Sequence, residues 1–188
     1  MLADYIKEKN KIHSRRIELE TYQITANRMI VHGILKDQRY IRVFDATGAL
    51  KEPGIVHHID VKLLIRSGPF TIKATEAQMR EVPIPECRET LDNLPQIHGL
   101  QVKSGFSKKV RSLVGGQNGC HHLAQLIAAM GQEIVSGGLT QTRTQKRKLP
   151  DQPEQLQEKQ FIFDSCRMWK RDGPRYKNLV RAIQAEHE

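Results

Sequence analysis

The chain has 188 residues, of which 38% are hydrophobic and 27% charged, so it is long enough for one domain with a packed core. It contains no apolar run near the ~18 residues that span a bilayer, and its N-terminus lacks the apolar stretch of a secretory signal. We therefore expect a cytoplasmic protein without a membrane segment. Three cysteines cannot all pair within one chain, which argues against a disulfide framework.

The net charge of +9, from 30 Lys and Arg against 21 Asp and Glu, favours an anionic partner or a partner protein with an acidic surface. Aromatic residues make up only 5% of the chain, so platforms for base stacking are scarce and nucleic-acid binding is not favoured. A solvated basic surface is the alternative. Much of the excess charge lies near the C-terminus, in Arg143, Lys146, Arg147, Lys148, Lys170, Arg171, Arg175, Lys177 and Arg181.

The first half of the chain has the pattern of an antiparallel sheet. After an N-terminal tail over residues 1–12, alternating and β-branched residues predict a hairpin from segments 15–22 and 28–36. A short strand is expected over 40–44 and the strongest strand over 55–65. Extended structure resumes over 70–74, after a turn at Ser67-Gly68-Pro69. The sheet should therefore have four to five strands.

The second half changes to a helical period. Short helices are predicted over 87–94 and 106–114, and a longer amphipathic helix is expected to end at Gly137-Gly138. Its apolar face consists of Leu123, Leu126, Ile127, Met130 and Ile134. A flexible polar insertion is predicted at about 139–159, with order returning at Phe161-Ile162-Phe163 and a closing helix after Gly173-Pro174. We expect one α+β domain over residues 13–188, with these helices packed on the sheet.

The feature that points most directly to chemistry is a glycine loop that leads into the long helix with a cysteine and two histidines. Cys120 precedes that helix, where the helix dipole favours a thiolate, the form that binds soft metals or attacks electrophiles. His122 supplies an imidazole nearby. The alternative is that Cys120 is a buried packing residue, since cysteine often packs in cores.

The other cysteines extend this feature to a candidate metal site. Cys87 follows a proline turn and Cys166 follows an apolar run, while His57 and His58 lie on the strongest predicted strand. Three thiolates with one or two imidazoles suit tetrahedral zinc or an iron-sulfur cluster with a non-cysteine ligand. Strand parity lets only one of the two adjacent histidines face the core.

The glycines have two further interpretations. Gly115, Gly116 and Gly119 could form a backbone nest that binds an anion, or simply make a turn between two helices. In a thiol enzyme, Cys120 would be the nucleophile, His57 or His122 the base, and the amides of 115–119 would stabilise an oxyanion. His57 is the better base, since Cys120 and His122 should point in different directions on the helix.

The chain also carries a series of short motifs that resembles a known family. They are Arg15-Arg16-Ile17, Gly33-Ile34-Leu35-Lys36-Asp37, Val56-His57-His58-Ile59, Pro85-x-Cys87, Gly119-Cys120-x-His122-Leu123 and Asp164-Ser165-Cys166-x-x-Trp169. In this order they resemble a bacterial family catalogued as domain of unknown function 2889, over roughly residues 13 to 175. The resemblance implies a site made of His57, Cys87, Cys120, His122 and Cys166. It favours His57 over His58 and His122 over His121.

Three hypotheses of function follow. The leading one is a Cys/His metal site, with zinc or an iron-sulfur cluster, in an accessory or assembly factor or in a protein that uses the metal as a Lewis acid. The second is a thiol-dependent enzyme with Cys120 as its nucleophile. The third is a basic binding or interaction module whose cysteines are structural.

Overall fold

The computed structural model describes residues 1–144, 148–152, 156, 163–164 and 166–186. Contacts divide the chain into two compact units, Met1–Thr142 and Arg143–Glu188, and each is described by itself. The single domain expected over residues 13–188 stays a prediction.

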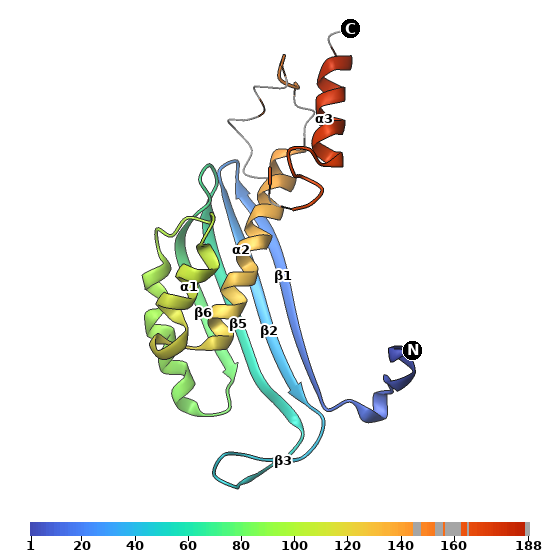
Figure 1. Ribbon diagram of the computed structural model, residues 1–188. Helices are drawn as coiled ribbons and strands as arrows, with labels where there is room; N and C mark the ends of the chain where they lie inside the picture. Colours follow the sequence, from blue (N-terminus) through green and yellow to red (C-terminus); the bar gives the residue numbers. More distant parts are fainter. Residues whose placement is uncertain (145–147, 153–155, 157–162, 165, 187–188) are drawn as a thin grey trace. The chain divides into compact units, whose positions relative to one another are not determined.

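A four-stranded antiparallel sheet forms the centre of the first unit (Figure 1). Its strands are β1 (His13–Thr25), β2 (Arg28–Arg39), β5 (Gly54–Arg66) and β6 (Thr71–Glu81), in the spatial order β1-β2-β5-β6. Between β2 and β5 the chain forms a separate small ribbon from β3 (Val43–Phe44) and β4 (Leu50–Lys51). The prediction of an antiparallel sheet in the N-terminal half is therefore confirmed, although β6 continues beyond the predicted segment 70–74.

One face of this sheet is the floor of the hydrophobic core. Alternate side chains of β2 and β5 are completely buried on that face, because successive residues of a strand point to opposite sides. They are Met29, Val31 and Leu35 on β2, and Ile59, Val61, Leu63 and Ile65 on β5. Odd-numbered positions of β2 up to Asp37 and of β5 from His57 onward thus face the core, and this parity also places the polar residues of the site.

Helices from the second half of the chain cover this face (Figure 1). They are the 3-10 helices η3 (Pro85–Ile97) and η4 (Gly116–Asn118) and the α-helices α1 (Phe106–Val114) and α2 (His121–Thr142). The predicted apolar face of α2 is fully buried over Leu123, Leu126, Ile127, Met130 and Ile134. The fold is therefore α+β, as expected. The short 3-10 helices η1 (Leu2–Tyr5) and η2 (Glu8–Asn10) precede β1.

The predicted end of the long helix at Gly137-Gly138 is wrong, because α2 continues to Thr142. The polar insertion predicted at 139–159 therefore cannot begin before the end of this helix. These glycines serve close packing rather than termination. A Cβ on Gly137 would lie 2.8 Å from Cβ of Thr21 on β1, and one on Gly138 would overlap the ring of Phe70. The missing side chains let α2 lie directly on the sheet.

The second unit contains α3 (Pro174–Ala185), the closing helix expected after Gly173-Pro174. Its basic residues Arg175, Lys177 and Arg181 are exposed, as are Arg143 and Lys148. Lys146, Arg147, Phe161 and Ile162 lie outside the described residues. Within the described parts of the chain, we find no helix with the length and apolar character that crossing a membrane requires.

Candidate functional site

Three polar residues form a row across the core face of the sheet. Arg15 of β1 is paired with Asp37 of β2, and Asp37 is in turn paired with His57 of β5. Asp37 and His57 have the same parity as the buried apolar residues of their strands, so both continue the core-facing rows at the end of the sheet. The register of three strands thus brings these side chains together.

Asp37 is the centre of the row and is only 1% exposed. The Arg15 guanidinium donates a hydrogen bond to each of its carboxylate oxygens. The distances are 2.6 Å from Nε to Oδ1 and 2.6 Å from Nη2 to Oδ2. Burial acts to raise the pKa of the Asp37 carboxyl, but the hydrogen bonds and charge of Arg15, with help from His57, lower it below its usual value. Asp37 is therefore an ionised acceptor at neutral pH.

His57 lies against this carboxylate, with Nδ1 3.0 Å from Oδ2 of Asp37. Because an ionised carboxylate only accepts hydrogen bonds, Nδ1 of His57 carries the proton in this contact. Burial lowers the pKa of His57, and this outweighs the opposing attraction of Asp37. His57 is consequently a neutral imidazole at pH 7.

His122 approaches from the helix above the sheet. The Cys120 carbonyl accepts the first hydrogen bond of α2, from the amide of Ala124, so His122 lies in the first turn. Its ring lies against that of His57, with the centroids 3.8 Å apart and the planes tilted by 32°, and its Nε2 lies 3.8 Å from Oδ2 of Asp37. Burial lowers the pKa of His122 to about 4, with further lowering by His57 and Arg15. This imidazole is neutral as well.

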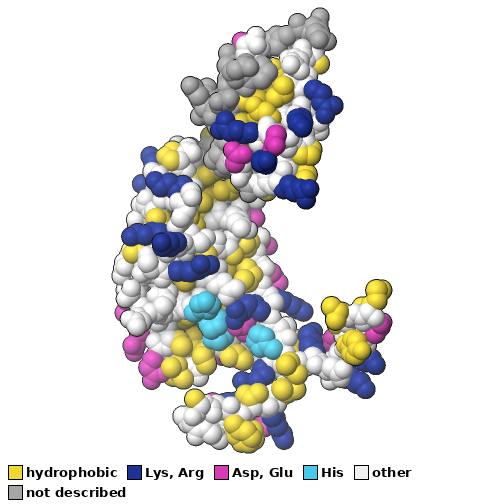
Figure 2. Space-filling view, in the orientation of Figure 1, with side chains coloured by type: hydrophobic (Ala, Val, Ile, Leu, Met, Phe, Trp, Pro, Cys, Tyr) yellow, Lys and Arg dark blue, Asp and Glu magenta, His cyan; other side chains and the backbone are white. Residues whose placement is uncertain are grey.

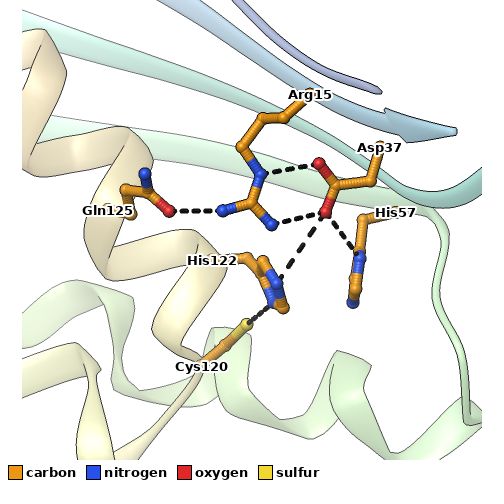
Figure 3. A network of polar contacts seen from close by, with 6 residues as sticks. All are labelled: Arg15, Asp37, His57, Cys120, His122 and Gln125. Atoms are coloured by element: carbon orange, nitrogen blue, oxygen red, sulfur yellow. Dashed lines mark hydrogen bonds and ion pairs between the residues drawn. The ribbon is translucent and has the colours of Figure 1, made fainter. Parts of the chain in front are cut away.

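Asp37, His57 and His122 therefore form a compact group of metal-ligand atoms, all within 4.8 Å of one another (Figure 3). Tetrahedral zinc, with bonds of about 2.0–2.2 Å to nitrogen and oxygen, holds its ligand atoms about 3.3–3.5 Å apart. From Oδ2 of Asp37, Nδ1 of His57 lies at 3.0 Å and Nε2 of His122 at 3.8 Å, on either side of this value. To bind an ion through Nδ1, His57 would first move its ring proton to Nε2. Small side-chain movements would be enough to fit an ion.

Cys120 lies next to this group rather than within it. Its Sγ is 3.9 Å from Nδ1 of His122, the nitrogen opposite the one that points to Asp37 (Figure 3). A proton on Nδ1 would be shared with the sulfur and leave the Nε2 lone pair free, whereas a proton on Nε2 would do the reverse. The protonation of His122 therefore decides whether it can bind a metal or receive the proton of Cys120.

Gln125 connects the sheet to the helix at this site. It lies one turn after His122 on α2, and its Oε1 accepts a hydrogen bond of 2.7 Å from Nη1 of Arg15. Arg15 thus binds Asp37 through one edge of its guanidinium and α2 through another atom. This bond ties the helix that carries His122 to the strand row that carries Asp37.

The remaining sequence-predicted residues lie in different environments. Cys87 is on η3, partly buried and packed against the hydrophobic core. Cys166 is exposed and belongs to the second unit. His58 has the opposite parity to His57, and its β5 neighbour Asp60 interacts with His32 and Arg80. The structure joins His57, His122 and Cys120, and a meeting of all three cysteines stays a prediction.

The glycine loop, residues 115–119, packs closely against the end of α1. A Cβ on Gly115 would lie 2.9 Å from Cβ of Ala124, and one on Gly119 would overlap the Val114 backbone. The loop is also tied by Asn118, whose Nδ2 donates to the carbonyl of Ser112 at 3.1 Å. Close packing between α1 and α2 thus explains Gly115 and Gly119, and anion binding by the loop stays a prediction.

Asp37 and Arg15 are the site residues that sequence reasoning missed. Both occur in motifs used for the family resemblance, but neither was assigned a role. The available signal was parity, because Asp37 follows Val31, Gly33 and Leu35 in the core-facing row of β2. A carboxylate in such a row needs a partner, since an unpaired buried charge is costly.

The site is accessible at its outer edge. Arg15 and His122 keep side-chain exposures of 31% and 26%, whereas Asp37 beneath them is covered. Figure 2 shows histidine side chains gathered on the surface near the start of α2, with Lys and Arg side chains beside them. A small ligand can therefore reach the imidazoles from solvent.

The comparisons with known proteins agree with the resemblance found in the motifs. No curated protein and no solved structure matched the chain. A family described as "Protein of unknown function (DUF2889)" matches residues 13–136, about two thirds of the chain, a range that includes the whole site. The chain therefore belongs to the DUF2889 family.

Proposed function

We propose that Asp37, His57 and His122 bind a divalent transition-metal ion of the zinc class, which acts as a Lewis acid. The observation that carries this proposal is the convergence of three ligand atoms within 4.8 Å from β2, β5 and α2. Both imidazoles are neutral at pH 7, because the pKa of each is lowered, so each has a lone pair to offer. Metal binding then removes no proton from an imidazolium, and it needs only the transfer of the His57 ring proton from Nδ1 to Nε2.

The donor set favours a catalytic over a structural ion. Structural zinc sites are closed by four protein ligands, whereas catalytic sites use three and leave a position for water or substrate. Here two imidazoles and one carboxylate supply three ligands, and Arg15 holds the carboxylate from outside, as partners of ligating carboxylates do. An ion in this position would face the open edge of the site.

The iron-sulfur hypothesis is not part of this proposal. Such clusters are held mainly by cysteine thiolates, and among the described contacts only Cys120 places a sulfur beside the group. A cytoplasmic location remains part of the proposal, because a reducing compartment would keep that thiol available. An accessory or assembly role for the metal stays a further prediction.

One observation supports a second candidate, a thiol-dependent enzyme. Cys120, His122 and Asp37 follow one another with separations of 3.9 and 3.8 Å, the order of nucleophile, base and orienting acid. In this case His122 rather than His57 would be the base, since Nδ1 of His122 faces the sulfur. Oδ2 of Asp37 already accepts hydrogen bonds from Arg15 and His57, so in the thiol hypothesis it would orient His122 only as a third partner.

The first experiment is a titration of tag-free, metal-free protein with Co²⁺, a spectroscopically visible substitute for Zn²⁺. We expect one bound ion per chain in wild type and in the control variants His58→Asn and His121→Asn. We expect no binding in His57→Asn or His122→Asn. Equal binding by all five proteins, or none in wild type, would contradict the metal proposal.

The protonation state of His122 distinguishes the two candidates. In the metal hypothesis the metal-free protein carries the His122 proton on Nδ1, and in the thiol hypothesis it carries this proton on Nε2. Nitrogen-15 NMR shifts of the imidazole separate these tautomers at pH 7. Protonation at Nε2, together with rapid alkylation of Cys120, would favour the thiol enzyme.

A further inference from the structure

We infer that the metal site takes an oxyanion, a phosphate or carboxylate group, which bridges the metal and the Arg15 guanidinium. This inference rests on the proposed function and adds the class of ligand. It depends on two features of the site: its charge with a metal bound, and the hydrogen-bond donors that Arg15 keeps for a ligand.

The charge of the loaded site is positive. Asp37 contributes one negative charge and Arg15 one positive charge, so a divalent ion on two neutral imidazoles leaves a local excess of two positive charges. Among the described residues, the ion-pair contacts of the two imidazoles are both with Asp37. The charge of Asp37 is already paired with that of Arg15. An anion at the open coordination position would balance the excess.

The donors of Arg15 supply the second feature. A guanidinium has five N–H groups, and the contacts with Asp37 and Gln125 account for three of them. One hydrogen on each of Nη1 and Nη2 remains, on a side chain that is 31% exposed. Both N–H groups are charged donors that can bind the oxygens of a phosphate or carboxylate.

One of these donors, Nη2, lies beside the atoms that would hold the proposed ion. Nη2 of Arg15 lies 2.6 Å from Oδ2 of Asp37, the oxygen nearest to both imidazoles. An oxyanion with one oxygen on the metal therefore has a second oxygen within reach of Arg15. Paired metal and arginine contacts of this kind stabilise negative charge on transferring phosphoryl groups.

Gln125 provides a test that leaves the three metal ligands in place. In Gln125→Glu a carboxylate replaces the amide oxygen on Nη1 and neutralises Arg15, so oxyanion affinity should fall about tenfold or more. In Gln125→Leu the Nη1 donor is released, so affinity should be at least that of wild type. Gln132→Glu adds the same charge at an exposed position of α2 and should change affinity less than about threefold.

The measurement is a titration of Co²⁺-loaded protein with inorganic phosphate and, separately, with acetate, followed by the cobalt absorption spectrum. Chloride is the control anion, since it cannot bridge two groups in this way. We expect saturable spectral shifts with phosphate or acetate, and the tighter of the two identifies the ligand class. Calorimetry on metal-free protein should show binding at least about tenfold weaker.

Three results would overturn the inference while Co²⁺ binding itself stands. One is phosphate and acetate binding that is equally strong without metal. The second is equal affinity in Gln125→Glu and Gln132→Glu. The third is equal loss in Gln125→Glu and Gln125→Leu, which would assign to Gln125 a positioning role instead. Failure of wild type to bind Co²⁺ would instead reject the proposed function on which the inference rests.

Discussion

The rings of His57 and His122 are in contact, with their centroids 3.8 Å apart, although one comes from strand β5 and the other from helix α2. Asp37 lies beside both rings, and Arg15 binds its two carboxylate oxygens. The site therefore exists only when the helix is docked on the sheet. Changes in ligand binding and changes in stability should therefore be coupled, so each variant needs a separate measurement of both.

Replacement of the central carboxylate should affect both properties. Asp37→Asn removes a ligand and leaves Arg15 without its counter-ion, so we expect metal affinity to fall about 100-fold or more. The free energy of unfolding should fall by about 2 kcal/mol. Metal titration and urea unfolding measure the two effects.

Asp60→Asn is the matched control for that variant. Asp60 also pairs with a histidine and an arginine, His32 and Arg80. On β5, however, its parity is opposite to that of His57, and it lies outside the metal group. It should lose stability and keep full metal affinity. If both variants lost metal binding equally, the loss would result from destabilised folding rather than from removal of a metal ligand.

Stability of the metal-free protein should depend on the protonation of His122. Folding lowers the pKa of this group from its ordinary value of 6.5 to about 4, so the unfolded chain binds the proton more readily. Stability is therefore complete above about pH 6.5 and falls as the pH decreases toward 4. Because a quarter of the side chain is exposed, we expect a loss of about 1–2 kcal/mol.

Urea unfolding at pH 7 and pH 4.5 with a chelator present measures this loss. His122→Asn should show a smaller decrease between the two pH values than wild type. An identical decrease in both proteins would show that other groups cause the pH dependence.

Cys120→Ser tests whether the Cys120 sulfur binds the metal directly or only lies next to the metal ligand His122. Since Sγ lies beside the His122 nitrogen that faces away from Asp37, we expect metal affinity to fall by about tenfold, the loss typical of an outer partner. Co²⁺ titration measures the affinity, and the intense absorption of sulfur ligation should be absent from wild type. A complete loss of binding would place the sulfur on the metal.

Because α2 contacts the sheet closely, we predict that replacing a glycine of this helix with alanine destabilises the protein. Gly137→Ala would place its Cβ 2.8 Å from Cβ of Thr21, so we expect the unfolding free energy to fall by about 1–3 kcal/mol. In a helix, alanine is normally more favourable than glycine by about 1 kcal/mol. A loss of stability in Gly137→Ala would therefore point to the packing contact. Ser136→Ala, at the exposed neighbouring position, should be nearly neutral. A stabilised Gly137→Ala variant would contradict the packing described here.

The sequence predicted the types of most elements because their apolar patterns are strong. The alternation in β2 and β5 and the helical spacing of Leu123, Leu126 and Ile127 match the buried positions observed. The end of α2 could not be predicted in this way. Glycines signal helix termination locally, and only the tertiary contacts with Thr21 and Phe70 show that Gly137 and Gly138 allow close packing instead.

The candidate site was predicted in part for a similar reason. Chemical identity drew attention to His57, His122 and Cys120, which the structure places near one another. Asp37 and Arg15 were missed because their roles depend on the register of β1, β2 and β5. That register results from long-range strand pairing, which a local pattern does not specify.

The most direct test of the central claim is a crystal structure of the protein with Zn²⁺, with anomalous diffraction recorded on both sides of the zinc absorption edge. We predict one strong anomalous peak, bonded to Oδ2 of Asp37 and to one ring nitrogen each of His57 and His122. A zinc peak at other residues, with these three side chains in their metal-free arrangement, would contradict the account.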